Sequence, residues 1–136
     1  MGEQRENYTI LHMHSFLSSG TTNIDSITNF RSYVKQAKEC GMKAMCITEH
    51  GNLFEWVHKK EEIEKAGMKY LHGIEIYVTE TLEEKIRDNY HCVLIAKNYE
   101  GVKEINRLSS TSYNRNDNHF YYAPRISFDE LINTSD

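Results

Sequence analysis

The stretch Tyr8-Thr9-Ile10-Leu11-His12-Met13-His14 closes an apolar run with two histidines that are separated by one residue. The apolar part predicts a short buried β-strand over residues 8–14. Because side chains alternate along a strand, His12 and His14 are expected to point to the same side. Imidazole is the commonest metal ligand at neutral pH, so the pair makes half of a metal site. Taken alone, the pair also fits one buried core histidine beside one exposed histidine.

The composition is typical of a soluble globular protein of about one domain. The chain has 136 residues, of which 39% are hydrophobic and 26% charged, and its formal net charge is −4. This balance excludes a protein that holds nucleic acid by charge alone. No apolar stretch reaches the roughly 20 residues of a membrane span, and the N-terminus has no signal-peptide core. Three cysteines without C-x-x-C spacing favour a reduced, cytoplasmic environment.

Three stretches have the apolar spacing of amphipathic helices, over residues 26–40, 53–66 and 100–112. Gly41 and Gly67 are expected to end the first two. The apolar positions of the first helix are Ile27, Phe30, Val34 and Ala37. Those of the second are Trp56, Val57 and Ile63, and those of the third are Val102, Ile105 and Leu108.

Polar side chains of the helices also have predicted positions. The charged run 59–62 is expected on a solvated face of the second helix. The pair Ser127 and Glu130 has the spacing of a capping box, which predicts a last short helix. Four more basic side chains are expected to be ordinary solvated charges, and phosphate binding is the alternative for each. They are Lys97, Lys103, Arg107 and Arg125.

The helices alternate with short strands, predicted over residues 44–48, 69–79 and 90–96. Strands that are apolar nearly throughout are typical of parallel sheets covered on both faces. The order therefore predicts an α/β fold built from βαβ units. An open doubly wound sheet and part of a (β/α) barrel both fit this pattern.

Polar residues cluster where the predicted strands end. Glu49 and His50 follow the second strand, and Glu75 lies between Ile74 and Ile76, facing away from both. Ligands bind at the C-terminal ends of parallel strands in such folds. A carboxylate inside an apolar strand costs several kcal/mol unless a cation or strong donors compensate it. Together with the first histidine pair, these residues predict a zinc, manganese or iron site.

Each of these residues also has a simpler interpretation. Glu49 could simply cap the turn before Gly51, and Glu75 could form an ion pair with a lysine. His50 could form a hydrogen bond with the backbone of its own turn. The metal site is favoured because the simpler interpretation has to hold for every residue at once.

Five segments resemble, in chain order, the motifs of the PHP (polymerase and histidinol phosphatase) superfamily. They are Leu11–Ser15, Gly41–Leu53, Gly73–Val78, Tyr90–Asn98 and Phe120–Ile126. The Gly-Asn-Leu after His50 and the last segment are similar to the version found in C-family replicative DNA polymerases. The resemblance implies that residues 1–136 are the N-terminal part of the PHP domain of such a polymerase, from a bacterium or phage.

The resemblance also implies a fold, an activity and partners. The family fold is a distorted (β/α)7 barrel with two or three divalent metals, here zinc or manganese, with iron or magnesium as alternatives. Its activity is phosphoester hydrolysis, and in polymerases 3′–5′ exonuclease proofreading at a DNA 3′ end. The implied partners are the remaining polymerase domains and other replisome subunits, without a membrane. The implied ligands are His12, His14, His50, Glu75 and His91, of which the first four are the implied catalytic residues.

Three positions depart from the family pattern. The family has an acidic ligand after its first motif; here the nearest candidate is Asp25, which also fits an N-cap of the helix that follows. Glu49 stands where the family has Asp, and we expect it to support ligands rather than to bind metal. His91 lies near the start of its strand, so that strand either begins earlier or runs antiparallel to its neighbours.

The family's remaining ligands come later than Asp136. We therefore expect an incomplete barrel within a longer polypeptide, with weakened metal binding or with self-association through its open edge. Two rival functions are a stand-alone phosphatase of the histidinol-phosphatase type and a non-catalytic structural PHP domain. The Gly-Asn-Leu extension argues against the phosphatase.

Overall fold

The computed structural model describes residues 8–19 and 24–135. A two-stranded parallel sheet has the order β1-β2, and a four-stranded sheet has the order β4-β3-β6-β5. Within the described residues, no helix is long and apolar enough to cross a membrane. The helices are η1 (Phe16–Ser18), α1 (Phe30–Glu39), α2 (Trp56–Lys65), α3 (Tyr99–Ser112) and α4 (Phe128–Ile132). The strands are β1 (Ala44–Cys46), β2 (Lys69–Leu71), β3 (Gly73–Thr79), β4 (Tyr90–Ile95), β5 (Phe120–Tyr121) and β6 (Ala123–Ser127).

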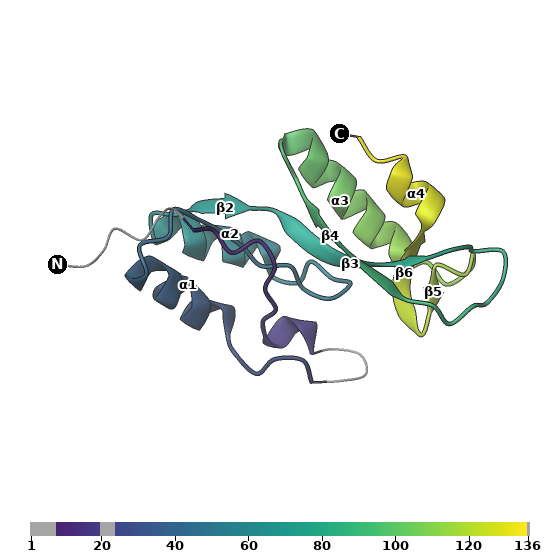
Figure 1. The fold of residues 1–136 in the computed structure, drawn as a ribbon, viewed down its shortest axis with the longest axis horizontal. Helices are drawn as coiled ribbons and strands as arrows, with labels where there is room; N and C mark the ends of the chain where they lie inside the picture. Colours follow the sequence, from purple (N-terminus) through teal and green to yellow (C-terminus); the bar gives the residue numbers. More distant parts are fainter. Residues whose placement is uncertain (1–7, 20–23, 136) are drawn as a thin grey trace.

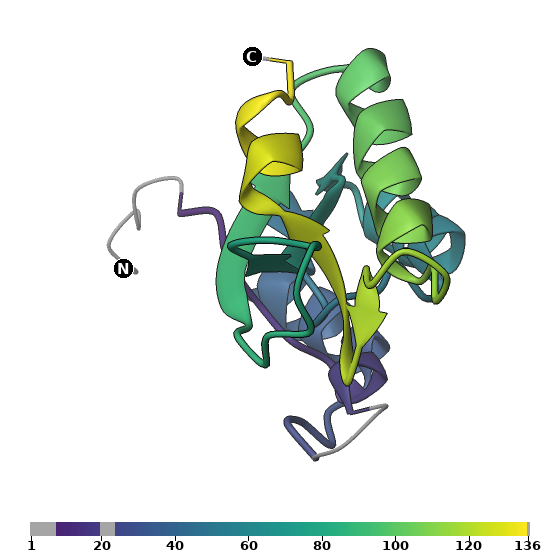
Figure 2. The same cartoon turned by 90° about the vertical axis from the view of Figure 1, so that its right-hand side faces the viewer.

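Two hydrophobic clusters hold these elements together, one at each end of the molecule (Figure 1). The first joins α1, α2 and β1 around Phe30, Met45 and Ile63. The second joins β3, β6 and α3 around Ile76 and Leu108. Figure 2 shows α3 and α4 side by side against the four-stranded sheet. The chain after β1 reaches β3 through an isolated parallel bridge between His50 and Glu75.

The predicted α/β class is confirmed, and the described strands form an open, incomplete barrel rather than a closed one. The parallel pattern typical of the predicted strands does not extend to β4. Of the two alternatives for this strand, which carries His91, the antiparallel direction is confirmed, because β4 pairs antiparallel with β3. Its cause is the connection over residues 80–89, since a parallel pair needs a crossover of about a dozen residues or more, usually a helix. The predicted strand over 69–79 is divided at His72, so β2 pairs with β1 and β3 with the other sheet.

The predicted strand over residues 8–14 does not form, although the segment runs extended beside β1. Cys46 and Thr48 donate backbone hydrogen bonds to the carbonyls of Ile10 and Met13. These acceptors are three residues apart while the donors are two apart, so the extra residue breaks the regular ladder. The Met13 N–H donates to the Thr48 hydroxyl, 3.2 Å away, instead of a carbonyl.

The first helix begins later than predicted. Its N-cap is Asn29, whose side chain accepts from the Arg31 N–H, so the interpretation of Asp25 as the cap is wrong. Ile27 lies before the helix and is 88% exposed, whereas the buried positions are Phe30, Val34 and Ala37. The helix ends before Gly41, as predicted.

Replacing Asn29 with alanine is expected to lower the free energy of unfolding by about 1 kcal/mol, because the first turn of α1 loses its cap. The Asp25→Ala variant should stay within about 0.5 kcal/mol of wild type, since Asp25 is exposed and caps nothing. Urea denaturation followed by circular dichroism measures both. Equal losses in the two variants would contradict the assignment.

Two cations expected in solvent are buried instead. Lys59 lies on the inner side of α2 and is 2% exposed, whereas Val57, expected inside, is 46% exposed. Arg125 in β6 is fully buried and donates to the backbone carbonyls of Ile86, Asn118 and His119. This guanidinium therefore fastens loops and is not available to phosphate. The predicted capping box of Ser127 and Glu130 is confirmed at α4.

Candidate metal centre

Three stretches of the chain bring their histidines to one carboxylate, that of Glu75 in a fourth. His12 and His14 come from the extended segment before η1, and His50 follows β1. Glu75 lies in β3 between the fully buried Ile74 and Ile76 and faces away from their cluster, as predicted. His91 belongs to the beginning of β4, which lies beside the end of β3 because these strands are antiparallel. The strand direction thus resolves the difficulty that the sequence left at His91.

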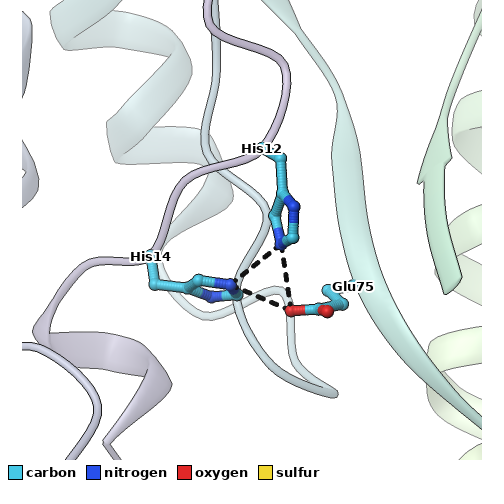
Figure 3. A group of neighbouring side chains, drawn as sticks. All are labelled: His12, His14 and Glu75. Atoms are coloured by element: carbon cyan, nitrogen blue, oxygen red, sulfur yellow. Dashed lines mark hydrogen bonds and ion pairs between the residues drawn. The ribbon is translucent and has the colours of Figure 1, made fainter. Parts of the chain in front are cut away.

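The distances show how closely these side chains converge, and Figure 3 shows three of them, His12, His14 and Glu75. Glu75 Oε2 lies 3.2 Å from His12 Nε2, 2.9 Å from His14 Nε2 and 3.0 Å from His50 Nδ1. The other oxygen, Oε1, is 3.1 Å from His91 Nδ1. His12 Nε2 and His14 Nε2 are themselves 3.0 Å apart, so the two rings point the same way as predicted.

The arrangement suits cations better than it suits hydrogen bonds. One carboxylate oxygen has about two lone pairs, yet Glu75 Oε2 faces three ring nitrogens. Among the described residues, neither Oε2 nor the buried His50 Nδ1 has a partner with hydrogen-bond geometry. Such unsatisfied buried atoms call for an explanation, and a bound ion is one of the few available. Imidazole and carboxylate together are a donor set for zinc, iron and manganese.

Glu75 belongs to two groups of ligand atoms, each small enough to surround one ion. The first group is His12, His14 and Glu75, and the second is His50, Glu75 and His91; within each, the ligand atoms lie within 4.8 Å of one another. Were each group to hold an ion, Glu75 would be a ligand in both.

The electrostatics favour the metal-binding protonation states of His14 and Glu75. Burial and the neighbouring His50 lower the pKa of His14, which leaves its ring neutral at neutral pH. Burial by itself would raise the pKa of Glu75, but His12, His50 and His14 outweigh burial and lower it. Metal ligands have to be deprotonated, so both shifts favour binding.

Asp25 approaches the same site from the segment before α1. Its Oδ2 atom lies 3.6 Å from His50 Nε2, on the other side of that ring from Glu75. The structure thus brings Asp25 beside the cluster, while it lies outside both compact groups of ligand atoms.

Glu49 lies behind the cluster. Its carboxylate is hydrogen-bonded to Ser15, Ser18 and Lys59 rather than directed at Glu75. It is 1% exposed, and its carboxylate accepts from Lys59 Nζ at 2.8 Å. Burial would raise the pKa of Glu49, but the Lys59 ammonium and the hydroxyls of Ser15 and Ser18 lower it. Burial lowers the pKa of Lys59, which Glu49 partly offsets. The pair is a buried ion pair, with Glu49 as an acceptor.

Tyr77 and Gly51 complete the wall of the site. The Tyr77 ring stacks on His50, with centroids 5.8 Å apart, and meets His91 edge-on at 4.9 Å. Gly51 has a φ of +61°, and a Cβ there would lie 2.8 Å from Pro124 and 3.0 Å from Tyr77. Only glycine therefore lets the chain turn here and carry His50 up to the cluster.

Sequence reasoning missed several residues that shape this site. Tyr77 was detectable, because it shares a strand face with Glu75 two residues earlier. Ser15, Ser18 and Lys59 were not, because nothing local distinguishes a buried serine or lysine from an exposed one.

The fold and the site together define an α/β protein with a cluster of imidazoles and one carboxylate beside its strands. Comparison with known families places it more narrowly: the chain belongs to the PHP domain family, whose model matches residues 11–136. A solved amidohydrolase from Chromobacterium violaceum is similar in fold, with a TM-score of 0.51 and 19% identity over 76% of this chain and 35% of that chain.

The curated relatives are much longer proteins. The chain is 37% identical over 133 residues to DNA polymerase III subunit alpha of Borreliella burgdorferi, covering 93% of this chain and 11% of that protein. It is 34% identical over 139 residues to the corresponding subunit of Aquifex aeolicus, with the same two coverages, 93% and 11%. The chain thus spans about a tenth of the length of the relatives it matches.

Proposed function

We propose that this chain binds divalent metal ions and is part of a metal-dependent phosphoesterase of the 3′–5′ exonuclease type. The observation that carries the proposal is the convergence of three ring nitrogens on Glu75 Oε2 at 2.9–3.2 Å. The proposed ligands and catalytic groups are His12, His14, His50 and Glu75, with His91 and Asp25 as further ligands. Zinc or manganese suits three or more imidazoles with carboxylate, and iron or magnesium is the alternative.

When bound, such ions lower the pKa of a water toward neutrality and stabilise the charge of phosphoester oxygens. The protein's own part is to hold the ligands in place. Glu75 joins the two groups of ligand atoms, and Tyr77 restricts the rings of His50 and His91. Asp25 lies 3.6 Å from His50 Nε2, the ring nitrogen that faces away from Glu75, and would be a further ligand there.

In this proposal the chain is the N-terminal part of the PHP domain of a cytoplasmic DNA polymerase III alpha subunit. The similarity to two such subunits over 93% of the chain supports this assignment. The substrate is then the 3′ end of DNA. The partners are the remaining polymerase domains and other replisome subunits, without a membrane.

The test is metal content and 3′-end release by the full-length polypeptide that contains this sequence. We expect bound zinc or manganese by elemental analysis, and Mn²⁺- or Zn²⁺-dependent release of the terminal nucleotide from a 3′-labelled primer. The His14→Ala variant should lose the ion of the group with His12 and Glu75, and with it the nucleotide release, because it removes one ligand of that group. The His58→Ala variant is the matched control, since that histidine lies on α2 with its side chain 62% exposed.

The rival functions give different results in the same assay. A full-length protein without bound metal and without nucleotide release would refute the enzymatic proposal and favour a structural PHP domain. Release of phosphate from histidinol phosphate, with the primer left intact, would favour the small-molecule phosphatase.

A further inference from the structure

A buried group of polar side chains lies behind His14, on the side away from Glu75. Its centre is the hydroxyl of Ser18 in η1, a residue that is 7% exposed. This oxygen contacts the Glu49 carboxylate, lies 3.0 Å from His14 Nδ1 and accepts the backbone N–H of His50 at 3.1 Å. One hydroxyl thus touches two of the candidate ligands.

The hydrogen atoms in this group can be assigned by counting donors. The Glu49 carboxylate receives four donors, two on each oxygen: the Ser15 N–H and hydroxyl, the Ser18 hydroxyl and Lys59 Nζ. An ionised carboxylate can only accept, so the single hydroxyl hydrogen of Ser18 points to Glu49. The Ser18 oxygen is then an acceptor toward its other neighbours. Its contact with His14 therefore requires a proton on His14 Nδ1.

We propose that Ser18, held by the buried Glu49–Lys59 pair, is a positioning residue that fixes His14 as the Nδ1–H tautomer. The tautomer of a neutral imidazole is set by the hydrogen bond that one ring nitrogen makes. With the proton on Nδ1, the lone pair of Nε2 faces Glu75 Oε2, 2.9 Å away, where a cation would lie. This inference rests on the proposed metal-binding function.

Lys59 gives the arrangement its rigidity. Its Nζ atom lies 2.8 Å from Glu49 Oε1, and the two side chains are 3% and 1% exposed. The lysine comes from α2, Glu49 follows β1, and Ser18 belongs to η1, so three separate elements are joined behind the ligands. Partners behind a metal-binding histidine orient its ring, and their loss lowers metal affinity by about 10–100-fold.

The test uses nitrogen-15 NMR of the metal-free 136-residue chain at neutral pH, together with Zn²⁺ titration. The wild-type spectrum should show His14 protonated on Nδ1. In Ser18→Ala the ring is free to carry its proton on Nε2, and the Zn²⁺ affinity should fall by about 10–100-fold. Ser18→Thr keeps the hydroxyl and should restore both properties. Ser110→Ala, an exposed serine of α3, is the control.

The outcomes separate this inference from the proposed function. An Nε2–H form of His14 in the wild type would overturn the inference, as would a Ser18→Ala variant with unchanged tautomer and affinity. The wild-type spectrum needs no variant, so it decides the matter should Ser18→Ala not fold. A wild type that binds no Zn²⁺ would overturn the proposed metal site, whereas an Nδ1–H signal in it would still support the hydrogen-bond assignment.

Discussion

Replacing Glu75 with glutamine is expected to abolish the binding of both ions proposed for this site, with a loss of affinity of more than about 100-fold for each. Removing a partner behind a ligand already costs about 10–100-fold, and Glu75 is itself a member of both groups of ligand atoms. Glutamine keeps the size of the side chain but removes the charge that compensates two cations. Titration calorimetry with Zn²⁺ or Mn²⁺ on the 136-residue chain measures the effect.

The stoichiometry distinguishes a shared carboxylate from an ordinary one. His91→Ala should remove one ion and retain the other, because His91 belongs only to the group with His50. Glu84→Gln, at an exposed position in the loop after β3, should leave both ions bound. A Glu75→Gln variant that still binds two ions would show that Glu75 is not shared by the two groups. If binding is lost, an unchanged circular dichroism spectrum would exclude unfolding of the variant as the cause of that loss.

Replacing Arg125 with methionine is expected to lower the free energy of unfolding by about 3–5 kcal/mol. The guanidinium is fully buried and donates to three backbone carbonyls, while its Nη1 atom lies 3.4 Å from Asp88 Oδ1. Methionine fills similar space but donates nothing, so several buried acceptors lose their partner at about 1–3 kcal/mol each. Urea denaturation measures the loss.

Arg107→Met provides the comparison for this variant. Arg107 is exposed on α3, and a surface change of this kind stays within about 0.5 kcal/mol. If Arg125→Met were as stable as Arg107→Met, the loops over residues 80–89 and 117–119 would not depend on the buried guanidinium.

Local patterns predicted much of the site. The alternation around Glu75 placed its carboxylate opposite Ile74 and Ile76, and those two side chains are fully buried. The spacing of His12 and His14 predicted that their rings face the same side, which holds although the predicted strand does not form there. The capping box at Ser127 depends on four consecutive residues and was predicted correctly. Each of these features is set by neighbours in sequence.

Other features depend on which distant segments meet, and no local pattern contains that information. His91 reaches Glu75 because β4 runs antiparallel to β3, a direction set by strand pairing. Asp25 lies beside His50 because α1 begins at Phe30, where packing on the first cluster starts.

The sequence by itself thus determined the α/β class and the set of metal-competent side chains, since these follow from residue type and short-range periodicity. The family followed from the resemblance of its motifs, and the family model confirms it. Only the tertiary structure decided that Lys59 and Arg125 are buried and that Ser18 lies behind His14. The physical reason is that a charged or hydroxyl side chain is buried only where partners from other elements satisfy it, and those partners are known only once the chain has folded.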